Sequence, residues 1–263
     1  MQQANFNTIA ANYDADFSSS IIGILQRNRV WHHLKSDLNQ TKIQSVLEIN
    51  CGTGVDAFWL AKQGYSVVAT DISSEMIHYA KQKLKETSIT NPEFLTCGFN
   101  ELKNVFTGKR FDLVFSNFAG LNCINEEELK KLNNDFNAIL NPNALLIMVL
   151  LGKKSWIERL YFLLKGNSKK AFRRENPDLA SLGDNSFQMT YCYKVDEVKE
   201  IFKDFNCINH KPIGLLIPPS YLEPLIKKLP FLKFVLQFAE SLVGGFSFLS
   251  DYADHTYLVF RKK

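Results

Sequence analysis

The sequence lacks any cysteine pattern typical of a metal site or of a disulfide framework. Its five cysteines are odd in number and scattered, with no Cys-x-x-Cys pair and no cysteine and histidine at the spacing of zinc ligands. A reducing compartment with free thiols fits this usage best. We therefore expect no bound metal.

Long apolar runs are also missing. No stretch of about 18 or more uncharged apolar residues occurs, which is the length that a membrane-spanning helix needs. The first residues, Met1 to Asn7, lack the basic segment and apolar run of a signal peptide. We expect a cytoplasmic protein, with peripheral contact at the inner face of the membrane left open.

A strong excess of one charge is absent as well. The formal net charge is +4, and 22% of the residues are charged against 46% that are hydrophobic. This mild balance does not demand a nucleic-acid partner, and we expect none. At 263 residues the chain is long enough for one large α/β domain with substantial insertions.

What the sequence does contain is a repeated alternation of short apolar runs with helical stretches. Repeats of this length predict a parallel, doubly wound sheet covered by helices on both faces. The expected strands cover residues 45–50, 66–71, 93–97, 110–116 and 144–151, and the expected helices begin near Thr53 or cover 74–86 and 126–140. A helix over 195–205 and strands over 207–214 and 256–260 complete the pattern.

Two stretches interrupt this rhythm. They predict one core with an N-terminal helical cap and two helical insertions that act as lids over the substrate. The predicted boundaries are 1–40 for the cap, 41–152 for the cofactor-binding core, 153–190 for the first insertion, 191–214 for the continued core, 215–253 for the second insertion and 254–263 for the last core strand.

A glycine-bearing turn carries the strongest chemical signal. Gly52 and Gly54 follow the first expected strand and precede a helix, so the backbone can approach a ligand closely there. Asp71 ends the second strand, where a carboxylate can accept hydrogen bonds from both ribose hydroxyls. The glycine pattern alone also fits a nicotinamide dinucleotide site, and Thr53 with Asp56 also forms a plausible capping box.

Further motifs occur in order around this turn. Glu48 lies inside the first strand, Asp71 opens Asp-Ile-Ser-Ser-Glu-Met-Ile-His-Tyr-Ala, and Phe111-Asp-Leu-Val-Phe-Ser-Asn-Phe118 supplies the fourth strand. Over roughly residues 41–152 the chain resembles the class I S-adenosylmethionine-dependent methyltransferases. The resemblance implies a Rossmann-like, seven-stranded, mostly parallel sheet with an antiparallel last strand, and S-adenosylmethionine as cofactor with S-adenosylhomocysteine as product.

The resemblance also implies roles for individual residues. Gly52 and Gly54 would line the methionine moiety, Asp71 would hold the ribose, and Ile72 and Met76 would border the adenine. The remaining expected cofactor contacts are Tyr13, Glu48, Asn50, Cys51, Phe99, Asn100 and Ser116.

Two positions depart from the family pattern. Asn50 stands where the family usually has glycine, but asparagine tolerates a left-handed backbone better than most residues. The family often has an acidic residue near Gly98, whereas here we expect Phe99 to pack on the adenine and Asn100 to make the polar contact. Tyr13 belongs to a segment similar to the leading helix of many small-molecule methyltransferases, where it either touches the cofactor carboxylate or only packs the cap.

Both insertions are expected over the active site, because ligands of open α/β sheets bind beyond the carboxyl ends of the parallel strands. The residues predicted to contact the methyl acceptor, which is the substrate, are Asn117, Phe118, Asn122, Trp156 and Tyr221. Aromatic residues in the insertions favour a small hydrophobic acceptor, aromatic or lipid-like, methylated on oxygen or carbon. The basic residues of the first insertion predict either a solvated face or contact with an anionic membrane surface or substrate tail.

His255 is the best candidate for a general base. It should lie on the active-site face with Asp254 and Asp251 nearby, and a carboxylate can poise an imidazole near neutral pH. A purely structural histidine is the alternative. For the whole protein, the alternatives are a cofactor-binding partner of a biosynthetic complex without catalysis, and an NAD(P)-dependent oxidoreductase using Tyr161 and Lys165.

Overall fold

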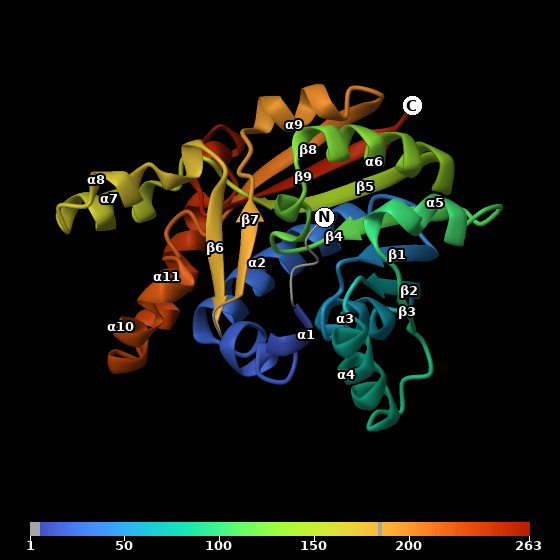
Figure 1. Ribbon diagram of the computed structural model, residues 1–263, viewed down its shortest axis with the longest axis horizontal. Coiled ribbons are helices and arrows are strands. Elements are labelled where there is room, and N and C mark those ends of the chain that lie inside the picture. Colours follow the sequence, from blue (N-terminus) through green and yellow to red (C-terminus); the bar gives the residue numbers. More distant parts are fainter. Residues whose placement is uncertain (1–5, 184–185) are drawn as a thin grey trace.

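A computed structural model describes residues 6–183 and 186–263. Its centre is a seven-stranded sheet in the order β3-β2-β1-β4-β5-β9-β8, in which β9 runs opposite to the other six strands (Figure 1). The strands are β1 (Ser45–Ile49), β2 (Ser66–Asp71), β3 (Glu93–Thr96), β4 (Phe111–Ser116), β5 (Leu140–Leu151), β8 (Phe205–Ile213) and β9 (His255–Lys262). The expected doubly wound, mostly parallel sheet is confirmed.

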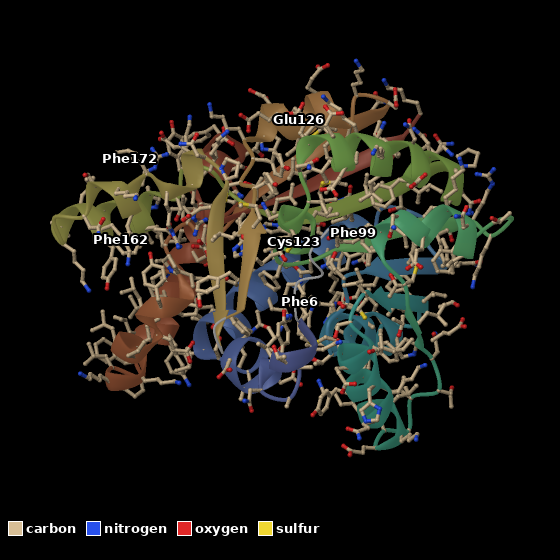
Figure 2. The ribbon with its side chains drawn as sticks, in the orientation of Figure 1. Phe6, Phe99, Cys123, Glu126, Phe162 and Phe172 are labelled. Carbon is tan, nitrogen blue, oxygen red and sulfur yellow. The ribbon has the colours of Figure 1, made fainter. Side chains whose placement is uncertain are left out.

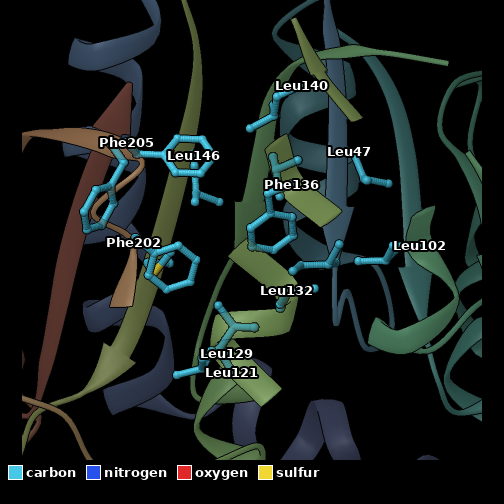
Figure 3. Packing of buried hydrophobic residues seen from close by; sticks show 14 of the residues in the cluster. Leu47, Leu102, Leu121, Leu129, Leu132, Phe136, Leu140, Leu146, Phe202 and Phe205 are labelled. Carbon is cyan, nitrogen blue, oxygen red and sulfur yellow. The ribbon is translucent and has the colours of Figure 1, made fainter. Parts of the chain in front are cut away.

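The central strands are largely apolar because the sheet buries both faces. Along β5, Leu146 and Met148 belong to one core cluster, and the alternating Ile147 and Val149 belong to the other. Figure 3 shows the first cluster, where Phe136 and Leu132 pack against the strands. This face is covered by α5 (Leu102–Val105), α6 (Glu126–Ile139) and α9 (Val195–Ile201), and the other by α2 (Ile21–Leu38), α3 (Val55–Lys62) and α4 (Ser74–Lys85).

Local capping explains where several helices begin. The Ser73 hydroxyl accepts a hydrogen bond from the backbone N–H of Met76 at 3.1 Å, and Asn125 forms a capping box with Glu128 at the start of α6. The helix expected near Thr53 begins instead at Val55, after Gly54 in the left-handed region. The alternative capping box of Thr53 is wrong, because its hydroxyl donates to Asp14 at 2.5 Å.

The cap, the second insertion and two short turns of the core shape the region above the carboxyl ends of the strands. The cap contains α1 (Phe6–Ile9), the π-helical turn η1 (Asp14–Ser18) and α2. The second insertion contains η5 (Ser220–Leu222), α10 (Glu223–Lys228), α11 (Leu232–Val243) and η6 (Ser247–Tyr252). Short 3-10 turns, η2 (Phe99–Glu101) and η3 (Gly120–Cys123), follow β3 and β4.

The first insertion is not helical throughout. After α7 (Trp156–Leu164), α8 (Ser168–Ala171) and η4 (Arg173–Glu175) it forms an antiparallel hairpin of β6 (Asp178–Gly183) and β7 (Ser186–Thr190). Apolar residues alternate with polar or small ones in this part, so that Leu179 pairs with Met189 on one face and Phe187 follows on the same face. The hairpin extends toward the cap (Figure 1), where β6 contacts α1, and β7 contacts η3.

Candidate active site

A cavity of about 940 Å³ lies above the carboxyl ends of the strands, at the upper end of the usual range for ligand pockets. Its walls come from the core, the cap, the β6–β7 hairpin and η5. Phe6, Phe99 and Cys123 line it from three different elements, and Figure 2 shows them converging at the centre of the molecule. The switch in strand order at β1 and β4 predicts this location.

The turn after β1 supplies one end of the cavity. Asn50 and Gly52 both adopt positive φ, 51° and 54°, and the N–H of Gly52 donates to Oδ2 of Asp71 at 2.8 Å. A Cβ on Gly52 would lie 3.4 Å from the ring of Tyr13, so the absence of a side chain leaves room beside that ring. Cys51 and Tyr13 line a small recess of the same turn.

Gly54 has a different role. Its φ of 83° and its position at the start of α3 require glycine, since a Cβ there would lie 2.7 Å from the ring of Phe94. Gly54 does not line the cavity described above. The structure therefore gives it a packing role between helix and sheet.

Asn50 joins the turn after β1 to the turn after β4. Its Oδ1 accepts a hydrogen bond from the Ser116 hydroxyl at 2.6 Å, and its Nδ2 donates to the backbone carbonyl of Asn117 at 2.8 Å. Ser116 is fully buried beneath the cavity and does not line it. The departure from glycine at Asn50 thus adds a link between neighbouring strands.

Asp71 holds the adjoining loop through both oxygens. Besides the bond from Gly52, its Oδ1 accepts from the N–H of Ser73 at 2.9 Å. Burial raises the pKa of Asp71, while these backbone hydrogen bonds oppose the rise. Asp71 lines the cavity together with Ile72, Met76, Phe99 and Asn100.

Glu48 lies under the turn and outside the cavity lining. Its side chain is buried, and Oε2 has no hydrogen-bond partner among the described residues. Burial, followed by the charge of Asp56, raises the pKa of Glu48 well above its ordinary value, which favours a neutral carboxyl. Burial also raises the pKa of Tyr13 to about 12, so its phenol remains a hydrogen-bond donor at neutral pH.

The residues predicted to contact the acceptor fall into two groups. Phe118 and Tyr221 line the cavity, and Asn117 lines the recess beside the turn while donating to Asp56 at 3.0 Å. Asn122 is buried and donates to the carbonyl of Tyr191 at 2.6 Å, and the indole of Trp156 donates to the carbonyl of Leu215 at 2.6 Å. Neither of these two lines the cavity.

His255 lines the cavity at the start of β9. Its ring meets the edge of Phe118 with the ring centroids 5.3 Å apart, and its Nδ1 lies 3.2 Å from Oδ2 of Asp254. Asp251 does not share this site, because its carboxylate accepts from the N–H of Val195 at 2.8 Å. One carboxylate therefore accompanies the imidazole, where the sequence suggested two.

Sequence reasoning missed a buried ionic network that forms one wall of the cavity. Arg174 donates to Glu158 at 2.7 Å and to Asp254 at 2.6 Å, and Gln26 donates to Asp254 at 3.0 Å. Although burial opposes it, the charges of Arg174 and then His255 hold the pKa of Asp254 well below its ordinary range. In the sequence Arg174 is one of several basic residues of the first insertion, and no local motif links it to partners so far along the chain.

The lining of the cavity argues against the oxidoreductase alternative. Tyr161 lies on α7 and Lys165 directly follows that helix, with its ammonium group 4.5 Å from the ring centroid of Tyr161. Neither residue lines the cavity. Within residues 6–183 and 186–263, no cluster of three or more histidine, cysteine or acidic side chains could hold a metal ion. No helix in that same part of the chain is long and apolar enough to cross a membrane.

Comparison with known proteins agrees with this geometry. Residues 46–143 match the methyltransferase domain family. The chain is 31% identical over 121 residues to mouse glycine N-methyltransferase (42% of this chain, 41% of the relative) and 29% identical over 105 residues to the tRNA 5-carboxymethoxyuridine methyltransferase of Escherichia coli (39% and 40%). The matches thus span about two fifths of the length of these curated relatives.

The fold is found in solved structures. An S-adenosylmethionine-dependent methyltransferase from Clostridium acetobutylicum superposes with a TM-score of 0.59 at 14% identity, covering 98% of each chain. The matched methyltransferase domain over residues 46–143 and this fold agree with the resemblance to the class I, Rossmann-like S-adenosylmethionine-dependent methyltransferases.

Proposed function

We propose that the protein transfers the methyl group of S-adenosylmethionine to oxygen or carbon of a small hydrophobic acceptor. The observation that supports this most directly is the continuity of one cavity. The same space is bordered by Gly52 and Asp71 of the glycine turn region and by Phe187 and Tyr221 of the two insertions. A cofactor and an acceptor can therefore meet within it.

The residues at the turn fit the cofactor of this family. Gly52 leaves space beside the Tyr13 ring, Asp71 offers a carboxylate at the end of β2, and Ile72 and Met76 offer apolar surface next to it. Phe99 and Asn100 border the same end. The bound cofactor would supply an electrophilic methyl group, while Ser116, through Asn50, and Gly54 hold the turn from outside the cavity.

The other end of the cavity fits an apolar acceptor. Its apolar side chains come from the cap, the turn after β4, the hairpin and η5. They are those of Phe17, Phe118, Leu179, Phe187, Met189 and Tyr221. His255 borders this region beside Phe118, where a base could take a proton from an attacking hydroxyl or carbon acid. The charge of Arg174 is already balanced by Glu158 and Asp254, so a charged acceptor gains little there.

Cofactor binding can be tested with a matched pair of isoleucines. Ile72 is 46% exposed and lines the cavity, whereas Ile24 is 45% exposed on α2 and does not. We expect Ile72→Asp to weaken S-adenosylhomocysteine binding about tenfold or more in calorimetric titration, since it replaces apolar contact with a charge. Ile24→Asp should bind as the unchanged protein does.

Turnover separates methyl transfer from cofactor binding alone. The unchanged protein, given methyl-labelled S-adenosylmethionine, should label hydrophobic phenols or lipid-like hydroxyls in preference to glycine and tRNA. Labelling of glycine or tRNA instead would contradict the proposed acceptor class. Cofactor binding with no labelling of any acceptor would favour the non-catalytic alternative, a partner protein in a biosynthetic complex.

A further inference from the structure

Helix α11 carries two apolar faces, of which the protein covers only one. The first contains Leu232 and Leu236, which pack against Ile22 and Ile217, and it continues to the buried Glu240. The second is a stripe at helical spacing formed by Phe231, Phe234, Val235, Phe238 and Leu242, each between 53% and 67% exposed. Large apolar side chains that recur on one exposed face usually mark an interaction surface.

The stripe continues onto the neighbouring helices. Leu225 and Leu229 are exposed on and after α10, and Leu163 and Leu164 are exposed at the end of α7. Tyr221 joins the two groups, because its ring lies 5.4 Å from the ring of Tyr161 on α7. Figure 1 shows α7 and α8 projecting from the same flank of the molecule as α10 and α11, and Phe162 lies on that flank in Figure 2. We call the exposed sides of α7, α8, α10 and α11 the outer flank.

Charges on these helices are sorted by sign. Within residues 156–171 and 220–243, all of which the structure describes, the acidic residues are Glu158, Glu223 and Glu240, and all three are buried. Glu158 binds Arg173 and Arg174, while Glu240 accepts four backbone N–H groups of residues 214–217. The acidic residues of these helices are therefore buried and bind groups of the protein itself, and the exposed charged residues are basic.

The exposed charges of the same stretch are lysines. Among them are Lys165, Lys169, Lys170, Lys227, Lys228 and Lys233, all exposed. Some lie against aromatic rings: Lys233 is 4.9 Å from the ring centroid of Phe234, and Lys170 is 5.9 Å from that of Phe162. Of these six lysines, Lys227 alone forms an ion pair within the part of the chain that the structure describes, with Glu223 at 3.2 Å. Ammonium groups mixed with aromatic and leucine side chains suit the boundary between lipid headgroups and acyl chains.

We propose that the outer flank docks the protein on an anionic lipid bilayer, with the aromatic stripe of α11 entering the interface and the lysines pairing with lipid phosphates. Charge complementarity favours an anionic bilayer over a second copy of the chain as the partner of this flank, because two such flanks would bring like charges together. The flank adjoins the cavity at Tyr221, which lines the cavity and touches α7. Docking needs no methyl transfer, so it stands or falls independently of the proposed reaction.

Flotation of the whole protein with vesicles tests this docking. The unchanged protein should float with vesicles of phosphatidylcholine mixed with phosphatidylglycerol and bind pure phosphatidylcholine vesicles far more weakly, and added salt should reduce the binding. Phe234→Glu with Phe238→Glu should lower the affinity for the mixed vesicles about tenfold or more. Lys169→Glu, Lys228→Glu and Lys233→Glu together should have a similar effect.

Matched variants elsewhere control for charge and hydrophobicity. Val105→Glu with Ile208→Glu removes two other exposed apolar residues, and Lys62→Glu, Lys81→Glu and Lys85→Glu make the same charge change on α3 and α4. Both should bind vesicles as the unchanged protein does, and circular dichroism should be the same for all variants. No flotation, or equal loss in the control variants, overturns the proposal. So does a dimer in sedimentation velocity that Phe234→Glu with Phe238→Glu converts to a monomer.

Discussion

At the scale of single residues, we expect the removal of the Arg174 side chain to lower the free energy of unfolding strongly. Its guanidinium, 11% exposed, lies between Glu158 and Asp254, whose side chains are 2% and 6% exposed. Replacing Arg174 with Met leaves Asp254 buried without an arginine partner and leaves Glu158 with Arg173 alone. We expect this to cost about 3–5 kcal/mol of unfolding free energy. Urea denaturation at pH 7 measures this loss. Arg159→Met, which breaks the more exposed ion pair with Glu175, should cost about 1 kcal/mol or less.

The pH dependence of this loss has a definite sign. Burial raises the pKa of Asp254, but Arg174 and His255 outweigh it and hold the pKa low, so this carboxylate stabilises the unchanged protein above a pH of about 4 and loses that effect as the pH falls further. Without Arg174, His255 is the remaining charge that opposes burial, so we expect the pKa of Asp254 to rise and its protonation to favour the folded state. The deficit of Arg174→Met should therefore shrink between pH 7 and pH 5. A deficit that stays constant over this range would contradict a buried, uncompensated carboxylate.

What the sequence predicts about residues depends on how local their role is. Gly52 and Asp71 stand in short motifs whose spacing follows from strand and turn geometry, and the structure joins them by one hydrogen bond. Arg174 contacts partners 16 and 80 positions away, so no pattern in the sequence could reveal the network. Asn122 and Trp156 have the polar groups of binding residues, yet those groups bond to the backbone of the fold.

At the scale of elements, Glu240 anchors α11 to the core. Its Oε1 accepts from the N–H groups of Gly214 and Leu215 at 2.8 Å and 3.0 Å, and its Oε2 accepts from Leu216 and Ile217 at 2.7 Å and 3.3 Å. Glu240→Gln keeps the size of the side chain but places an amide donor opposite two donors. We expect a loss of about 1–3 kcal/mol in unfolding free energy.

Hydrogen exchange locates this effect within the chain. In Glu240→Gln the amides of residues 214–217 should exchange faster than in the unchanged protein, while amides of the central strand β1 keep their relative protection. Glu200→Gln, at an exposed position on α9, should change stability by no more than about 0.5 kcal/mol. Equal protection of residues 214–217 in both variants would show that another contact anchors α11.

Elements were predicted from sequence where one physical pattern dominates. Apolar runs in the sequence predict the buried strands, and β2 lies at its expected bounds of Ser66–Asp71. The hairpin β6–β7 was missed, because its alternation is short and lies beside a basic, polar stretch that gives no strand signal. Strand β5 begins four residues before its expected start. Its first two residues precede Pro142, and Asn143, whose backbone is left-handed with a φ of 62°, follows.

At the scale of the whole molecule, we expect the first part of the cap, residues 6–18, to open most easily. Ile9, Ala10 and Met76 form a small apolar cluster separate from the two clusters on the sheet, and Asp14 holds the turn through hydrogen bonding with Thr53 and an ion pair with Lys83. Few buried contacts thus oppose local opening. Yet Phe6, Tyr13 and Phe17 form a wall of the cavity, so a ligand bound there touches both cap and core.

Ligand binding should therefore tighten the cap more than the rest of the protein. A ligand that needs the closed cap lowers the population of the opened state by a factor of about 100 when its concentration is about 100 times Kd. We expect S-adenosylhomocysteine to slow amide exchange over residues 6–18 by up to that factor, and to leave α9, which does not line the cavity, unchanged. NADH should slow neither segment. If calorimetry shows the sulfur ligand bound while residues 6–18 exchange at the same rate as before, the cap does not close over the cofactor.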